Sequence, residues 1–123
     1  MSVRRTLFLS FALCFAPTLS PAQSPHQPIV DVVHIDFMPG HDDAVPALTA
    51  YVAHASHDPN ILHIELYQQI SATNHYTLVE TFRSLAAYNA LISEPYTRSF
   101  RNVISPALGS PFDERLHTQV AIH

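Results

Sequence analysis

Hydrophobic and polar residues follow regular periods along most of the chain after residue 28. Val30–Met38 alternates apolar and polar residues and stops at Pro39-Gly40, which predicts a strand. Apolar residues at 44, 45, 48, 52 and 55 then recur at helical spacing, with Pro46 tolerable in the first turn. Asp58-Pro59-Asn60 breaks this pattern, so the sequence predicts that the helix ends there.

The second half of the chain repeats this order of elements. Two strands, Ile61–Ile70 and Tyr76–Phe82, are joined by the polar turn 71–74. Ser84 is a good N-cap for a helix through Leu91. After Pro95 a further helical stretch covers about residues 97–108, and residues 116–122 alternate once more as a last strand. The order β-α-β-β-α-β predicts an α+β, ferredoxin-like fold with an antiparallel sheet.

The helices of such a fold cover one face of the sheet and leave the other face open. On the Ile61–Ile70 strand both sets of alternate residues are substantially apolar, with Leu62, Ile64 and Leu66 on one side and Ile61 and Tyr67 on the other. A sheet with one solvated face would alternate more cleanly. We therefore expect a second copy to pack sheet to sheet, which gives a homodimer.

The first 22 residues have the organisation of a signal peptide. A basic start, residues 1–5, precedes an apolar run over residues 7–16 and small residues at 20 and 22 that suit cleavage before Gln23. The apolar run is shorter than the roughly 20 residues that span a bilayer. Residues 23–28 follow as a short linker to a domain of residues 29–123. These features predict a periplasmic or secreted protein.

The composition limits the partners that the exported chain can have. The full sequence has six arginines, no lysine and ten Asp and Glu residues, which gives a formal net charge of −4 at pH 7. Without Arg4 and Arg5 of the predicted signal, the exported chain keeps four arginines and has a formal net charge of −6. Binding to nucleic acid or to anionic lipid needs clustered positive charge, so we expect neither partner. The single cysteine, Cys14, lies in the predicted signal, so the exported chain would contain no disulfide.

Candidate acid–base residues lie on the two strands that flank the 71–74 turn. If this turn is centred between Ala72 and Thr73, Glu65 faces Glu80, and two facing carboxylates raise the pKa of one of them. A carboxyl group held near neutrality can remove the proton from a phenol or hydroquinone. The alternative is a set of solvated polar side chains, because a register slip of one residue would separate the group. This register places on one sheet face His63, Glu65, Tyr67, Tyr76, Glu80 and Phe82.

Three segments share a distinctive pattern. Leu78–Phe82 is an apolar stretch with a Glu two residues before an aromatic residue, and it is followed by Tyr96–Arg101 and by Pro111–Leu116. In this order they resemble the antibiotic biosynthesis monooxygenase family of small α+β barrels. The resemblance covers about residues 29–118 and implies a dimeric α+β barrel with a substrate cavity between the sheet and the helices.

The resemblance also implies chemistry without a metal or flavin, because members of this family often oxidise aromatic substrates with no cofactor. In relatives the positions of Glu80 and Phe82 point into the substrate cavity. Two histidines that are common in the family are replaced by Leu91 and Tyr96, and the chain has no tryptophan, so the resemblance does not extend to haem degradation. With only two glycines the chain also lacks the means to build a dinucleotide-binding or phosphate loop.

Further substrate-binding candidates lie on the predicted helices. Tyr88 could close the pocket as a hydrogen-bond donor or fill the core. Arg101, like Arg83 and Arg98, could hold an anionic or quinone-like oxygen, or could pair on the surface with an acidic residue such as Glu94 or Asp113. Tyr96 and Arg101 both belong to the segment that resembles the family.

Nine histidines call for a test of metal-ligand spacing. His54 and His57 could offer two ligands from a helix end, while His34 with Asp36, or His63 with Glu65, could offer two from one strand face. None has the spacing of a known site, and no third ligand follows nearby. We expect no metal.

The leading hypothesis is an exported, homodimeric, cofactor-independent monooxygenase-like protein that oxidises a small aromatic such as a quinol or polyphenol with O2. Glu80 or Glu65 would act as the base, His63 and Tyr67 would position oxygens, and Phe82 would form an apolar wall with Tyr88. The alternative from another class is a non-catalytic or stress-related protein that sequesters a small ligand in the same cavity. A third reading is a purely structural dimer module.

Overall fold

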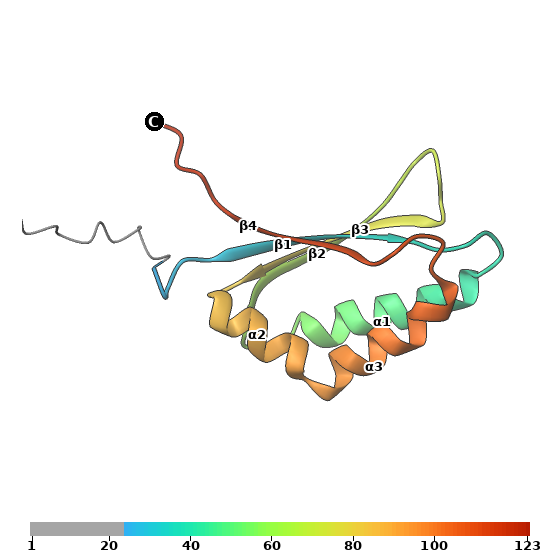
Figure 1. Ribbon diagram of the computed structural model, residues 1–123, viewed down its shortest axis with the longest axis horizontal. Helices are drawn as coiled ribbons and strands as arrows, with labels where there is room; N and C mark the ends of the chain where they lie inside the picture. Colours follow the sequence, from blue (N-terminus) through green and yellow to red (C-terminus); the bar gives the residue numbers. More distant parts are fainter. Residues whose placement is uncertain (1–23) are drawn as a thin grey trace, which may run out of the picture.

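The computed structural model describes residues 24–123, so the predicted signal peptide, residues 1–22, lies outside the described residues. Residues 24–28, within the predicted linker, make a turn in which the Gln27 amide donates to the Ser24 carbonyl at 2.9 Å. The rest of the described chain forms two layers, a sheet and three helices that all lie on the same side of it (Figure 1). Over this part of the chain, no helix has the length and apolar character needed to cross a membrane.

The sheet has four strands, β1 (Ile29–Asp36), β2 (Ile61–Gln68), β3 (His75–Phe82) and β4 (Asp113–Thr118). Their order is β2-β3-β1-β4, and every neighbouring pair is antiparallel, so the predicted ferredoxin-like α+β class is confirmed. The predicted bounds of the last strand, 116–122, were wrong. β4 starts at Asp113 because its pairing follows β1, from His34 opposite Asp113 to Ile29 opposite Thr118.

The helices are α1 (Val45–Ala55), α2 (Leu85–Ser93) and α3 (Pro95–Ile104), with the short 3-10 turns η1 (Asp42–Ala44) and η2 (Ser105–Ala107). The predicted N-cap of α2 is confirmed, since the Ala87 amide donates to the Ser84 Oγ at 3.1 Å. Proline stands in the first turn of both α1 and α3, where its missing N–H costs no helical hydrogen bond.

The hydrophobic core lies between the sheet and the helices. The residues of β1 and β3 that point toward the helices are buried, apart from the partly buried Tyr76, and α1, α2 and α3 each add apolar side chains to the same cluster. Burial of these side chains is the main source of stability for the two layers. The largest fully buried apolar side chains are Phe82, Ile35, Leu48, Leu78, Leu91, Ile104 and Val33.

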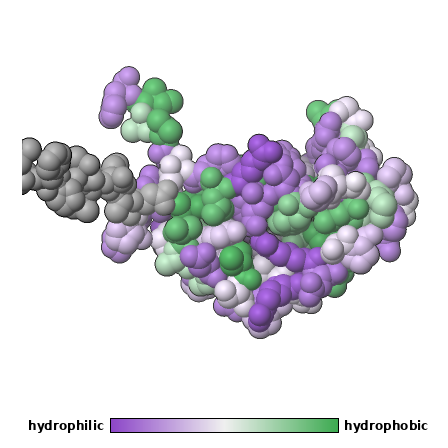
Figure 2. Space-filling model, viewed as in Figure 1, coloured by the Kyte–Doolittle hydropathy of each residue, from purple (hydrophilic) through white to green (hydrophobic). Residues whose placement is uncertain are grey.

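No described element covers the opposite face of the sheet (Figure 1). The prediction that β2 is apolar on both sides was wrong, because a bulge between Ile61 and His63 turns Ile61 toward the helices, where it is buried. The open face instead mixes Val32 and its ladder partner Val79 with histidines and charged residues. Figure 2 shows a similar mixture over the visible side of the molecule, with hydrophobic patches separated by hydrophilic residues.

Candidate functional site

The most distinctive polar group of the core is the carboxylate of Glu80 on β3. Glu80 is 4% exposed, and the Tyr51 hydroxyl of α1 donates to its Oε1 at 2.8 Å. Burial raises the pKa of Glu80 to about 7, although the hydrogen bond from Tyr51 lowers it in part. Glu80 can therefore both accept and release a proton at neutral pH, as a general acid–base group must.

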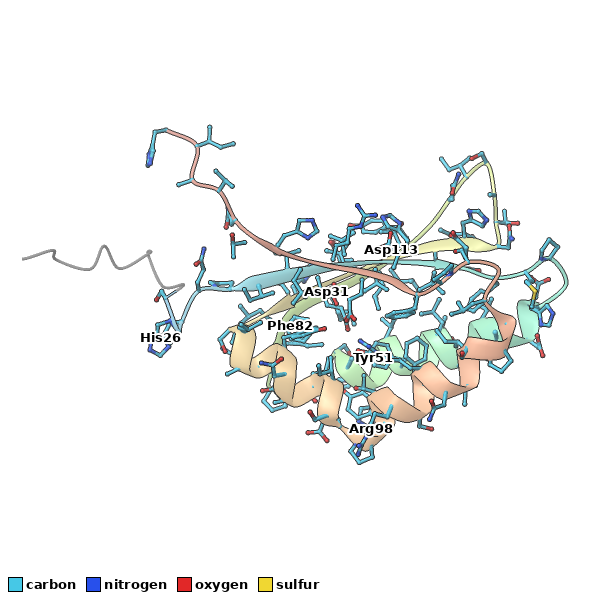
Figure 3. All side chains as sticks on the ribbon, viewed as in Figure 1. His26, Asp31, Tyr51, Phe82, Arg98 and Asp113 are labelled. Atoms are coloured by element: carbon cyan, nitrogen blue, oxygen red, sulfur yellow. The ribbon has the colours of Figure 1, made fainter. Side chains whose placement is uncertain are left out.

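A second carboxyl group, Asp31 of β1, lies directly opposite Glu80 in the β1–β3 ladder. Asp31 is fully buried, and among the described residues neither of its carboxylate oxygens has a hydrogen-bond partner. Burial raises the pKa of Asp31 to about 8, and the neighbouring carboxyl groups of Glu114 and Glu80 act in the same direction. Figure 3 shows Asp31 in the layer between sheet and helices, together with Tyr51 and Phe82.

The positive charge beside these acids comes from Arg101 of α3. Its Nη2 donates to Glu114 Oε1 of β4 at 2.7 Å, and its guanidinium lies 4.9 Å from the ring centre of Phe112. Of the two alternatives for Arg101, the structure shows pairing with an acid, but the acid is Glu114 rather than Glu94 or Asp113, because Glu114 points to the helix side at this position of β4. Arg101 therefore neutralises one of three neighbouring acids.

Aromatic rings form the walls around the acids. Phe82 is fully buried on β3, two residues from Glu80, and its ring meets that of Tyr88 of α2 edge to face at 5.4 Å. The Tyr51 ring stacks on Phe100 of α3 with centroids 4.3 Å apart. Burial and the charge of Glu114 raise the pKa of Tyr88 to about 12, so Tyr88 stays a neutral hydrogen-bond donor at ordinary pH. The site thus combines proton-active carboxyl groups with apolar ring surfaces.

A groove of about 260 Å³ lies between α1 and α3, and the ring of Tyr51 forms part of its lining. Its walls include the rings of Tyr51 and Phe100. Nearer the solvent lie the rings of His54 and Tyr96, which are tilted by 41° with centroids 4.0 Å apart. The Tyr96 hydroxyl donates to Asp58 Oδ2 at 3.1 Å, which holds this ring at the groove. Tyr51 belongs both to the groove and to the Glu80 site, since its ring lines the first and its hydroxyl contacts the second.

The predicted pairing of Glu65 with Glu80 was wrong. Gln68 pairs with Tyr76, so the β2–β3 hairpin is centred on Ala72, and Ile64 is the residue opposite Glu80. Because side chains alternate along a strand, this shift of one residue moves half of the predicted group to the other face of the sheet. Tyr76, Glu80 and Phe82 point toward the helices; the open face receives His63, Glu65 and Tyr67.

On that open face the three remaining candidates form a solvated cluster. His63 Nε2 lies 3.1 Å from Glu65 Oε1, and the Tyr67 hydroxyl and His63 together lower the pKa of Glu65. Tyr67 is 51% exposed. A carboxylate with a lowered pKa is a weak base at neutral pH, so this cluster differs chemically from the Glu80 site.

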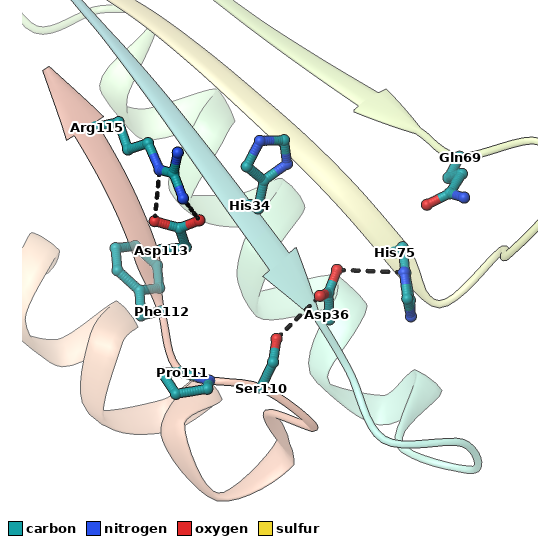
Figure 4. A pocket seen from close by; sticks show the side chains of 9 residues that line it. All are labelled: His34, Asp36, Gln69, His75, Ser110, Pro111, Phe112, Asp113 and Arg115. Carbon is teal, nitrogen blue, oxygen red and sulfur yellow. Dashed lines mark hydrogen bonds and ion pairs between the residues drawn. The ribbon is translucent and has the colours of Figure 1, made fainter.

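The open face also carries a hollow of about 560 Å³ at the β1–β4 side (Figure 4). In it Asp36 Oδ1 lies 3.4 Å from His75 Nδ1, and Asp36 Oδ2 accepts a hydrogen bond from the Ser110 hydroxyl at 2.9 Å. Arg115 is held by both carboxylate oxygens of Asp113. The charged groups of this hollow thus already pair with one another.

The histidines do not assemble a metal site in the described part of the chain. Within residues 24–123 no group of three or more His, Cys, Asp or Glu side chains is arranged to hold a metal ion. His54, one of the candidate ligands, instead stacks on Tyr96, and His63 contacts a single acid.

Sequence analysis missed Asp31, Tyr51 and Glu114. The sequence did contain a signal for Asp31. The alternate residues of β1 that are buried are Ile29, Asp31, Val33 and Ile35, so Asp31 is the one acid among apolar residues. Tyr51 stands at helical spacing from Leu48 and Ala55, which marks the same buried face of α1. A polar residue in the buried phase of an amphipathic element is therefore the pattern that would have found both.

The fold and the site define a class: a two-layer ferredoxin-like protein whose sheet and helices enclose buried carboxyl groups. Residues 28–103 match the family described as antibiotic biosynthesis monooxygenase. Because this match spans more than half of the sequence, the chain belongs to the antibiotic biosynthesis monooxygenase family. No curated protein matches the sequence significantly.

Solved structures agree with this assignment at the level of fold. Rv0793 from Mycobacterium tuberculosis superimposes with a TM-score of 0.72 at 17% identity, covering 77% of this chain and 97% of its own. Protein SO0527 from Shewanella oneidensis gives a TM-score of 0.69 at 22% identity, with 76% and 92% covered. A conserved protein from Methanosarcina mazei gives 0.69 at 11% identity, with 76% and 93% covered.

Proposed function

We propose that this protein is a cofactor-independent monooxygenase of small aromatic compounds such as quinols or polyphenols, with Glu80 as its base. The observation that carries the proposal is a carboxyl group whose pKa burial raises to about 7, set among aromatic rings. Membership of the monooxygenase family supports the same class of reaction. Pockets with apolar walls and a few convergent polar groups are the usual form of a small-molecule site.

In the proposed reaction Glu80 takes the proton of a substrate hydroxyl group. The phenolate gives one electron to O2, and the two radicals combine in a new C–O bond. The bond forms at a carbon that carries hydrogen, and the resulting peroxide takes up the proton that Glu80 removed. The O–O bond and the C–H bond at this carbon then break, the outer oxygen atom leaves as water, and the inner oxygen atom stays in the product as a carbonyl. The substrate loses two hydrogen atoms and gains one oxygen atom, and the second oxygen atom of O2 leaves as water.

The remaining residues have distinct roles in this proposal. The substrate arrives through the groove between α1 and α3 and displaces Tyr51, whose ring lines that groove. Phe82 and Tyr88 contact the aromatic ring of the substrate, while Arg101, already bound to Glu114, stabilises negative charge that develops on oxygen. Tyr96 and His54 form the outer wall through which the ligand passes.

The test is oxygen uptake by the purified protein with a panel of hydroquinones and anthrone-like phenols. We expect uptake above the spontaneous rate, reduced roughly 10²–10⁴-fold in Glu80→Gln, which is the usual contribution of a general base. Glu65→Gln is the matched control, because it makes the same change on the other face of the sheet. Enzyme-dependent uptake that survives Glu80→Gln would contradict the proposal.

A second candidate function is ligand binding without turnover. The α1–α3 groove favours it, since about 260 Å³ lined by Tyr51, Tyr96 and Phe100 can hold one aromatic ring without reaching Glu80. Tight binding of a phenol, with no oxygen uptake and no effect of Glu80→Gln on affinity, would favour this function over the first.

We also propose that the functional unit is a homodimer in which a second copy covers the open sheet face. This face combines the central pair Val32 and Val79 with polar neighbours, a mixture common in interfaces between proteins. Light scattering during size-exclusion chromatography should give a dimer mass for the natural protein and a monomer mass for Val79→Glu. Val103→Glu is the control, because Val103 is 58% exposed on α3. A natural protein that elutes as a monomer would refute the dimer.

Export remains part of the proposal. Residues 1–22 have the order of a signal peptide, with a basic start, an apolar run and small residues before Gln23. Expression of the full chain in a bacterium should yield a periplasmic protein whose N-terminal sequence begins at Gln23. Recovery of the protein from the cytoplasm with residue 1 or 2 at its N-terminus would contradict export.

A further inference from the structure

Asp31 is a buried acid on a central strand of the sheet. β1 lies between β3 and β4, and the neighbours of Asp31 in the buried phase of the strand are Ile29 and Val33. The side chain has no exposed surface and points to the helix side (Figure 3). An aspartate at such a position is rare unless it is paired, so it calls for an explanation.

Asp31 and Glu80 form a pair by the geometry of the sheet. They are direct partners in the antiparallel β1–β3 ladder, so both side chains project from the same face. Directly opposed residues have their Cβ atoms about 4.5–5.5 Å apart. The two carboxyl groups therefore stand side by side toward the aromatic walls made by Phe82 and Tyr88.

The neighbouring acids accept hydrogen bonds from other residue types, and Asp31 does not. Tyr51 donates to Glu80, and Arg101 donates to Glu114. Over residues 24–123 no N–H or hydroxyl group donates to either buried Asp31 oxygen, and the hydrogen-bonding neighbour of Asp31 is the carboxyl group of Glu114, which requires a proton on one of the two acids. A buried carboxyl group without a donor lowers the stability of the folded protein. Its presence in the core therefore suggests that the group binds a ligand.

The acids around Asp31 outnumber the positive charges, so Asp31 and Glu80 together retain one proton. The groups that face it are Glu80 of β3, Glu114 of β4, Tyr51 of α1, Tyr88 of α2 and Arg101 of α3. Arg101 compensates one acid, and the tyrosines are neutral. Burial raises the pKa of both Asp31 and Glu80, and the acids around them act in the same direction. The group therefore retains a proton at neutral pH, and Asp31 can hold this proton while Glu80 is ionised.

We propose that Asp31 and Glu80 together bind a 1,2-diphenol, in which Glu80 accepts the proton of one hydroxyl group and the carboxyl group of Asp31 donates a hydrogen bond to the oxygen beside it. Two adjacent carboxyl groups meet two oxygens only if both oxygens lie on the same edge of the ring. The hydroxyl groups of a 1,4-diphenol point in opposite directions, so that isomer reaches one carboxyl group alone. This inference rests on the proposed function and names its substrate class.

The test compares the affinities of 1,2-dihydroxybenzene, 1,4-dihydroxybenzene and phenol by calorimetry without oxygen. We expect 1,2-dihydroxybenzene to bind at least about tenfold more tightly than the other two, the factor that one hydrogen bond worth about 1.4 kcal/mol gives. Asp31→Asn keeps an N–H donor and should keep the preference. Asp31→Val removes the donor and should abolish the preference, while phenol binding stays within about twofold.

Asp36→Asn is the matched control, because Asp36 lies on the same strand and contacts His75 and Ser110 instead. It should leave all three affinities unchanged. Circular dichroism monitors folding, and we expect Asp31→Val to raise the melting temperature, since an apolar side chain replaces an unpartnered buried acid. That result would exclude unfolding as the cause of a lost preference.

The outcomes separate this inference from the proposed function. Equal affinities in the natural protein, or a 1,2-preference that survives Asp31→Val, would overturn the diphenol pair and leave Glu80 as a base for other phenols. Absence of binding for all three compounds, together with no oxygen uptake from the wider panel, would overturn both. Loss of the preference in Asp31→Asn would also overturn the diphenol pair, because the amide keeps a hydrogen-bond donor at the same position.

Discussion

Two glutamates on neighbouring strands show how the sheet divides this protein into two chemical environments. Glu80 points to the helices and is 4% exposed, and its burial raises its pKa to about 7. Glu65 points to solvent, where the Tyr67 hydroxyl and His63 lower its pKa. The residue type is the same, so burial and partners decide which carboxyl group can exchange protons at neutral pH.

The same division applies to the remaining polar residues. On the helix side of the sheet, within the described residues 24–123, Asp31, Glu80 and Glu114 share the cation of Arg101, so the acids outnumber the positive charges. On the open face each acid of the Figure 4 hollow has its own partner, as Asp36 has His75 and Asp113 has Arg115. Excess buried acid is costly, and such groups are typical of functional sites rather than of structural ion pairs.

The largest expected effect is on stability, from Phe82→Ala. Phe82 is fully buried, and removing a buried aromatic ring costs about 3–5 kcal/mol of unfolding free energy through lost burial and the cavity left behind. Tyr67→Ala, on the open face, should change stability little in comparison. Urea denaturation at two protein concentrations measures both and separates any contribution of association. A larger loss for Tyr67→Ala would reverse the assignment of inner and outer faces.

The pH dependence of stability should have opposite signs for the two glutamates. The folded-state pKa of Glu80 is raised from 4.5 to about 7, so the folded protein holds this proton more tightly than the unfolded chain does. Stability is therefore greatest below about pH 4.5 and is lost as the pH rises toward 7, by on the order of 3 kcal/mol for this group. Glu65, with a lowered pKa, contributes stability that is lost as the pH falls through its folded pKa.

Unfolding free energies of the natural protein and of Glu80→Gln, measured between pH 4.5 and 8, test this sign. The variant should gain relative to the natural protein as the pH rises, and Asp31→Asn should do the same up to about pH 8. Comparison with each variant cancels the titration of the other groups. A constant difference across this pH range would mean that Glu80 titrates as an ordinary exposed carboxyl group.

Tyr51→Phe should have the next largest effect. The variant removes the hydroxyl that donates to Glu80, and a buried hydrogen bond to a charged group is worth about 1.5–3 kcal/mol. Because this hydrogen bond lowers the pKa of Glu80, its loss should move the pH midpoint of oxygen uptake upward. Tyr76→Phe is the control, since the Tyr76 hydroxyl accepts a hydrogen bond only from the exposed Gln68. An unchanged midpoint would show that Tyr51 does not tune Glu80.

The fold was largely predictable from sequence, because its signals are local. Periodic apolar residues, the Ser84 cap and Pro95 at the start of α3 act within a few residues, and they gave the order of elements. The last strand was misplaced because its start is fixed by pairing with β1, a contact between residues far apart in sequence. The bulge at Ile61 is also a product of pairing, and it has no distinctive sequence signal.

The candidate site was predictable only in part, for a related reason. Glu80 and Phe82 could be placed together because residues two apart on a strand share a face. Glu65 could not be placed, since its face depends on whether the hairpin is centred on Ala72 or one half-residue beyond it. Asp31 was overlooked although its position in the buried phase of β1 needed no register at all. Periodicity within a strand is thus a safer guide to a site than pairing between strands.

Glu65→Gln should have the smallest effect of these substitutions, and it tests the open face of the sheet as Glu80→Gln tests the helix side. The exposed contact between His63 and Glu65 contributes little to stability, because solvent screens polar interactions at the surface. We expect an unchanged melting temperature and oxygen uptake within about twofold of the natural protein. If Glu65→Gln instead lost as much activity as Glu80→Gln, the open face would have to contribute to the reaction. Such a contribution would require a substrate bound between two copies of the sheet, and dilution below the dimer dissociation constant should then abolish turnover as well.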